Sequence, residues 1–130
     1  MSKRKKSVSD STLHRLWRRA VLAYWNYTDP IDGTYGAENL ECHHIVKRKH
    51  FVTRWDWRNG LPLSAKSHRW VHEHTVAANK ILPELIDTTY LEEMERYIKP
   101  DFLAAHGWTE DEFRLHVKGE LLKVIEEYED

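Results

Sequence analysis

Apolar residues recur at three- and four-residue spacing near both ends of the chain, which predicts an amphipathic helix in each place. The first helix is expected from Ser11, with Ser9 or Ser11 as its N-cap. Its apolar stripe comprises Leu13, Leu16, Trp17, Ala20, Val21 and Tyr24. The last helix is expected after Thr109 and Glu112, which have capping-box spacing. Its stripe comprises Phe113, Val117, Leu121, Val124 and Tyr128.

The middle of the chain predicts short strands followed by further helices. A turn-rich stretch, residues 26–39, precedes a short strand over 40–46, and residues 60–63 form a second strand that Pro62 marks as brief or at an edge. Ser64 is the expected N-cap of a helix from Ala65 to about residue 79. Pro83 is expected near the start of another helical segment and not in its interior. Thr89 with Glu92 predicts one more capped helix, ending before Pro100.

Length and composition fit one compact domain with a core. The chain has 130 residues, of which 41% are hydrophobic, and its six tryptophans favour dense packing. It holds one cysteine, Cys42, so it can form no internal disulfide, and no apolar run is long enough to span a bilayer. These features favour a cytoplasmic protein with no membrane partner.

Charge is distributed unevenly along the chain although the formal net charge is only −1. Residues 1–80 hold 15 Lys and Arg against 7 Asp and Glu, whereas residues 81–130 hold 5 against 14. This asymmetry favours a basic face for a polyanion, although two solvated halves would give the same count. Residues 1–10 are expected to be a flexible basic arm, and residues 80–130 a set of acidic helices.

Histidines carry the most informative pattern, because six of the nine lie between residues 43 and 74. His68 and His72 are four apart, which places both rings on one face of the expected helix. His43, at the end of the expected strand, can supply a third imidazole. Three protein ligands with one open position are typical of a catalytic metal site.

His44 follows the proposed ligand His43 directly, and adjacent side chains of a strand point to opposite faces. If His43 faces a metal ion, His44 points away from it and is free to take a proton from water. The tandem pair therefore predicts one ligand and one general base.

The segment LECHHIVKRKHFVTRWDWRNGLPLSAKSHRWVHEH, residues 40–74, resembles the motif of the HNH endonucleases, also called ββα-metal or His-Me finger nucleases. From His44 to Asn59 is 15 residues, from Asn59 to His68 is 9, and from His68 to His72 is 4, which is similar to the bacterial toxin DNases of that family. The string around Arg54 also resembles stand-alone phage HNH proteins. The resemblance implies a β-hairpin and a helix around one ion, embedded in a mainly helical α+β chain. The module would span residues 38–79, after an N-terminal helix and loop over 11–37.

The resemblance also implies roles for individual residues. His43, His68 and His72 would bind one divalent ion, with Mg²⁺, Mn²⁺, Ni²⁺ and Zn²⁺ all open, and His44 would be the general base. Asn59 would brace the loop and hold the His44 ring by a backbone contact, while Arg54 would contact the scissile region. Backbone phosphates of DNA would be bound by Lys47, Arg48, Lys49 and Arg58. The products would carry a 5′-phosphate and a 3′-hydroxyl.

One departure from the family pattern concerns the zinc-binding cysteine pairs that many members carry beside the motif. This chain has Ser64 and Ser67 where such a pair would fall, so a second, structural zinc site is not expected. Packing by Trp55, Trp57 and Trp70 would then brace the module.

Three functions are compatible with the sequence: a metal-dependent DNA endonuclease, a DNA-binding protein with a non-catalytic metal finger, and a structural zinc protein. Only the first needs His44. If the chain is phage-encoded, its place is the host cytoplasm. Duplex or branched DNA, nicking or cutting, the target sequence and the oligomeric state are all left open.

Overall fold

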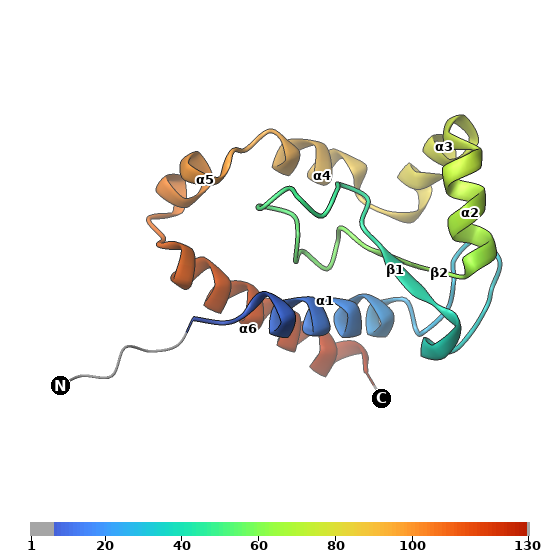
Figure 1. Ribbon diagram of the computed structural model, residues 1–130, viewed down its shortest axis with the longest axis horizontal. Coiled ribbons are helices and arrows are strands. Elements are labelled where there is room, and N and C mark those ends of the chain that lie inside the picture. The colour runs from blue at the N-terminus through green and yellow to red at the C-terminus, as the bar shows by residue number, and fades with distance from the viewer. Residues whose placement is uncertain (1–6, 130) are drawn as a thin grey trace.

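The computed structural model describes residues 7–129, which form six α-helices and one two-stranded antiparallel sheet (Figure 1). In chain order the elements are α1 (Asp10–Tyr24), a 3₁₀ turn (Ala37–Asn39), β1 (Glu41–His43), β2 (Leu61–Leu63), α2 (Ala65–Glu73), α3 (Thr75–Leu85), α4 (Thr88–Glu95), α5 (Lys99–His106) and α6 (Glu110–Tyr128). The expected α+β class, mainly helical with one small hairpin, is confirmed. Among the described residues, no helix is both long enough and apolar enough to cross a membrane.

The two helices predicted from hydrophobic spacing pack against each other and form the base of the molecule (Figure 1). Ser9 caps α1 by accepting a hydrogen bond of 3.2 Å from the Thr12 N–H. The α1 stripe from Leu13 to Val21 is buried in one core with Leu121, Val124 and Ile125 of α6, whereas Tyr24, also assigned to the stripe, is 39% exposed. At the start of α6, Thr109 and Glu112 form the predicted capping box, with both reciprocal bonds 3.1 Å long. Local spacing therefore located both helices correctly.

The long loop between the strands, residues 44–60, is anchored in the same core. Trp55 is 2% exposed and packs with α1, α5 and α6, and the Trp17 indole N–H donates to the Asp56 carbonyl at 2.8 Å. Gly60 lies so close to α1 that a Cβ atom there would meet Val21 at 2.7 Å and Trp17 at 2.8 Å. The loop is thus fixed to α1 at several points.

The helix expected over residues 65–79 is wrong in its extent, because it breaks at His74. This residue adopts φ −124° and ψ 59°, ends α2 and precedes α3. The sequence holds no Gly or Pro here, so the local pattern carries no sign of a break. The change of direction lets α3 bury Ala78.

Other boundaries also differ from the sequence predictions. The strands span three residues each, with Glu41 paired to Leu63 and His43 to Leu61, so the first strand is shorter than 40–46. Pro83 lies inside α3, two residues before its end, so the expectation that it lies near the start of a helical segment is wrong; its missing N–H removes one hydrogen bond from the last turn.

Two further differences concern α4 and α5. Asp87, and not Thr89, caps α4, accepting from the Tyr90 N–H at 3.0 Å. Helix α5 was not expected, and Pro100 is accommodated in its first turn, where its missing N–H costs little. Residues 1–6 of the expected basic arm lie outside the described residues, and the helix already begins at Asp10.

The start of α2 is braced by hydrogen bonds to the turn-rich loop and not by the three expected tryptophans. The Asp29 carboxylate is 1% exposed and accepts from the backbone N–H groups of Ile31 at 2.6 Å and Ser64 at 2.8 Å. The Ser64 hydroxyl donates to Asp32 at 2.6 Å, which holds the pKa of that carboxyl well below its ordinary value. Trp55 is buried in the core, whereas Trp57 and Trp70 are only partly buried.

We expect Asp29→Ala to lower the free energy of unfolding by about 2–4 kcal/mol, because buried N–H groups would lose a charged acceptor. Urea titrations followed by tryptophan fluorescence measure the change. Asp101→Ala, on the exposed first turn of α5, is the matched control and should stay within about 0.5 kcal/mol of wild type. Equal midpoints for the two variants would contradict this account of the loop.

Candidate metal centre and the adjoining histidine

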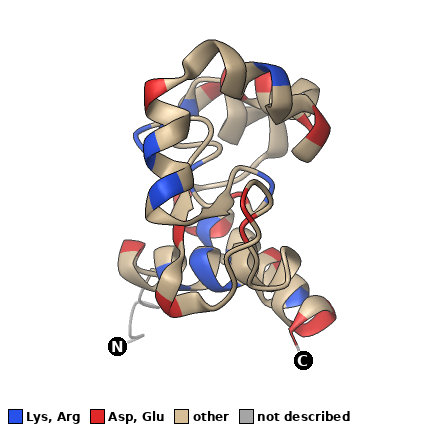
Figure 2. Cartoon of the chain, turned by 90° about the vertical axis from the view of Figure 1, so that its right-hand side faces the viewer, with Lys and Arg blue, Asp and Glu red and all other residues tan. Residues whose placement is uncertain are grey.

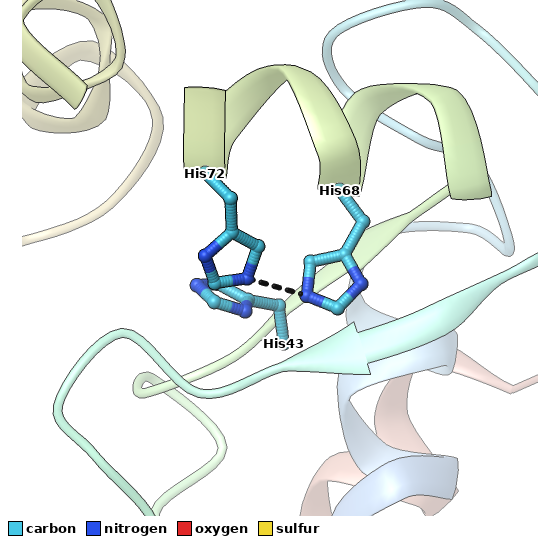
Figure 3. Close-up of side chains that lie close together, drawn as sticks. All are labelled: His43, His68 and His72. Carbon is cyan, nitrogen blue, oxygen red and sulfur yellow. Dashed lines mark hydrogen bonds between the residues drawn. The ribbon is translucent and has the colours of Figure 1, made fainter. Parts of the chain in front are cut away.

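Three histidine side chains converge between the hairpin and α2 (Figure 3). His43 comes from β1, and His68 and His72 come from successive turns of α2. One ring nitrogen of each lies within 4.8 Å of the others, and the Nε2 atoms of His68 and His72 are 3.0 Å apart. The structure therefore brings together the three residues that the sequence proposed as ligands.

Short-range geometry produces this convergence. The pairing of His43 with Leu61 sets the hairpin register, and β2 runs through Ser64 directly into α2. The four-residue spacing of His68 and His72 then turns both rings toward the hairpin. The loop of residues 44–60 separates β1 from β2, so pairing of the two strands is what brings His43 next to α2.

Glu41 is a member of this site that the sequence interpretation did not include. Its carboxylate accepts a hydrogen bond of 3.0 Å from Nδ1 of His68. A proton on Nδ1 leaves the lone pair of His68 on Nε2, which is the atom that faces His72. Glu41 precedes His43 by two residues in β1, so strand alternation already placed both side chains on one face.

His43 is held in the neutral form that a metal ion requires. Burial, the largest cause, and charge repulsion from the neighbouring His68 and His72 together lower its pKa to about 4. At neutral pH the imidazole therefore offers a free lone pair. A set of three imidazole ligands suits a divalent transition ion.

His44 lies on the opposite face of the chain from His43, against α1. Its ring stacks on Trp17 with centroids 3.9 Å apart and planes 7° from parallel. Its Nε2 lies 2.9 Å from the Arg54 carbonyl oxygen, which can only accept, so Nε2 carries the proton. Nδ1 then holds the lone pair. It has no hydrogen-bond partner among the described residues and is not enclosed, so it reaches the surface.

The surroundings of His44 keep this ring neutral as well. Burial is the largest influence and lowers its pKa, while the bond to Arg54 acts in the opposite direction. The positive charges of Arg48 and Arg54 and the nearby His14 add to the lowering. A neutral imidazole with a free Nδ1 can accept a proton from water.

Asn59 acts on His44 through the loop and not by touching the ring. Its side chain is fully buried, accepts from the Val46 N–H at 2.7 Å, and donates to the carbonyls of Val46 at 3.0 Å and Thr53 at 3.1 Å. These bonds tie both ends of the loop together. The Arg54 carbonyl that holds His44 follows Thr53 directly.

Two of the three arginines proposed for the substrate, Arg54 and Arg58, already have partners within the chain. Nε of Arg54 donates to the Arg48 carbonyl at 2.8 Å. Arg58 donates to the Asp56 carboxylate at 2.9 and 3.2 Å, and its guanidinium lies 4.0 Å from the centroid of the Tyr90 ring.

The remaining residues proposed for phosphate binding, Lys47, Arg48 and Lys49, are exposed. Basic and acidic positions interleave over the cartoon and do not separate into two sides (Figure 2).

Two residues of α1 also belong to this neighbourhood, Trp17, which the sequence pattern assigned to the apolar stripe, and His14. Trp17 supports the His44 ring, and His14 stacks on Trp17 at 5.6 Å, with its Nδ1 buried and without a hydrogen-bond partner among the described residues. His14 and His44 are separated by 30 positions, so no local spacing could reveal their proximity.

Comparison with protein-family models, curated proteins and solved structures found no match. The interpretation of the site therefore rests on its own geometry and on the motif at residues 40–74.

Glu41→Gln is expected to weaken Zn²⁺ binding about 10- to 100-fold, because an amide fixes the His68 tautomer less strongly than a carboxylate does. Isothermal titration calorimetry of the metal-free protein measures the affinity. Glu38→Gln changes the same side chain at an exposed position three residues earlier and should leave the affinity unchanged. If both variants bind Zn²⁺ like wild type, Glu41 does not orient a ligand.

Proposed function

We propose that this chain is a metal-dependent DNA endonuclease of the HNH type. In this proposal β1, β2 and α2 form a ββα-metal finger within a module over residues 38–79, and the helices of residues 80–130 support it. The single observation that carries the proposal is that the two adjacent histidines at the end of β1 have different surroundings. Three imidazoles converge on one side of the hairpin, and a fourth, at the next position, presents a free nitrogen on the other.

The donor set fits one divalent ion bound by His43, His68 and His72. All three offer nitrogen, which suits Zn²⁺ or Ni²⁺ better than Mg²⁺, an ion that prefers oxygen ligands. An ion with an open coordination position supplies positive charge that stabilises the transition state of phosphodiester hydrolysis. Glu41 and the low pKa of His43 keep the ligand atoms available.

His44 is the proposed general base. Its Nε2–H is held by the Arg54 carbonyl, so Nδ1 takes the proton when water attacks phosphorus. The leaving group is the 3′ oxygen, which gives a 5′-phosphate and a 3′-hydroxyl. Trp17 fixes the plane of the ring, and Asn59 fixes the loop that supplies the carbonyl.

Binding of DNA is assigned to the exposed cations of the loop after β1. Lys47, Arg48 and Lys49 extend from the same segment as His44 and can contact backbone phosphates. Arg58 would have to leave Asp56 before it could contact a phosphate, so it contributes least in this proposal. Such contacts give affinity that falls with salt and carry no sequence information.

A plasmid-nicking assay tests this function. With Zn²⁺, Ni²⁺, Mn²⁺ or Mg²⁺ supplied separately, wild type should nick supercoiled DNA, and His44→Ala should be slower by about 10²- to 10⁴-fold because a general base is lost. His116→Ala, which removes an exposed imidazole of α6 far along the chain from the site, is the matched control and should nick at the wild-type rate.

Circular dichroism and Zn²⁺ affinity must be unchanged in the His44 variant, so that loss of folding is not mistaken for loss of catalysis. Equal nicking by wild type and His44→Ala would remove His44 from the mechanism. Binding of DNA without nicking in any metal would favour a non-catalytic finger. A chain that unfolds without metal and never binds DNA would favour a structural zinc protein.

A further inference from the structure

A small pocket of about 200 Å³ adjoins the three-histidine cluster on the side of α3. Two of the proposed ligands, His43 and His72, form one end of it. Leu61 and Leu63 of β2 and Leu82 of α3 also line it. The pocket and the cluster thus share atoms and are parts of one continuous site.

The break at His74 produces this pocket. Because the chain changes direction there, α3 does not continue the axis of α2, and it contributes only Ala78 to the buried residues. The side chain of Leu82 remains partly exposed and faces the hairpin across the pocket. The break at His74, which the sequence pattern did not predict, therefore shapes this pocket.

The lining is neutral apart from the two histidines. None of the residues that line the pocket is Asp, Glu, Lys or Arg, and aliphatic side chains form most of its surface. Thr75 and Asn79 lie on its exposed rim and carry its other polar side-chain atoms. With a cation held by the histidines, the site would be positive at one end and apolar along the rest.

We infer that this pocket holds the nucleoside group attached to the phosphate that is cut. A nucleotide diester has the matching chemistry, because its anionic phosphate is bonded to a deoxyribose that carries a flat base with apolar faces. The hydroxyl of Thr75 and the amide of Asn79 provide donors and acceptors for the edge of that base. This inference rests on the proposed function, since it places a phosphodiester at the three histidines.

The shape of the pocket also limits what it holds. Its volume is smaller than the usual range for drug-sized ligands, roughly 300–1,000 Å³. One nucleoside group is a suitable occupant, whereas a stacked pair of bases is not. The base next to the cut must then leave its neighbours, so DNA with unpaired bases is bound better than continuous duplex.

The test uses wild-type protein loaded with Zn²⁺ and the dinucleotide thymidylyl-(3′,5′)-thymidine. Methyl NMR should show shifts at Leu61, Leu63, Val71 and Leu82, with none at Leu115 or Leu122 on the exposed face of α6. Dimethyl phosphate, which has the same charged diester and no nucleoside, should leave the pocket methyl groups of Leu82 and Leu63 unshifted.

Leu82→Ala removes one of the side chains that line the pocket and should weaken dinucleotide binding about three- to tenfold. Binding of Zn²⁺ and of dimethyl phosphate should be unchanged. Ile81→Ala is the matched control, since it removes an equally apolar, partly buried side chain of α3 that does not line the pocket. Comparing the two variants distinguishes the loss of a contact in the pocket from a general destabilisation of α3.

The same samples distinguish failure of this inference from failure of the proposed function. Pocket shifts without thymidine and thymidine 5′-phosphate as products would support the nucleoside pocket and count against hydrolysis. Products without pocket shifts, or equal effects of Leu82→Ala and Ile81→Ala, would overturn the pocket. Absence of any dinucleotide binding by the Zn²⁺-loaded protein would overturn it as well.

Discussion

Adjacent side chains at the end of a β-strand point to opposite faces, and this constraint at His43 and His44 determines how the whole site is divided. One ring turns to α2 and joins His68 and His72, and the other turns to α1 and stacks on Trp17. A strand of only three residues is enough, because pairing with Leu61 fixes its direction and register. Metal binding and proton transfer can then occupy neighbouring positions without competing for the same atoms.

The rest of the fold fixes the positions of the side chains on these two faces of the chain at the end of β1. Helices α1 and α6 form the core, and the loop over residues 44–60 is attached to it by Trp17, Trp55 and the close approach at Gly60. Asn59 closes that loop, so the Arg54 carbonyl stands where it can hold His44. On the other face, Asp29 fixes the start of α2 through the Ser64 N–H. Carboxylate and hydroxyl hydrogen bonds thus brace the start of α2.

Sequence reasoning predicted the parts of this arrangement that depend on local spacing. Two amphipathic helices, the Ser9 and Thr109 caps and the face shared by His68 and His72 all follow from intervals of three or four residues. What it missed depends on contacts between distant segments. The support of His44 by Trp17 joins α1 to the end of β1, and the break at His74 carries no Gly or Pro. Strand alternation alone could have placed Glu41 on the same face as His43, but its hydrogen-bond partner His68 lies 27 residues away in the sequence.

The central claim is that three imidazoles share one cation while His44 stays free, and ¹⁵N NMR of the histidine rings with one equivalent of Zn²⁺ tests it most directly. The account predicts that ring nitrogens of His43, His68 and His72 shift together at a stoichiometry of one, including Nε2 of His68, while both nitrogens of His44 stay close to their metal-free positions. Coordination shifts at His44, or shifts spread over histidines outside the cluster, would contradict it.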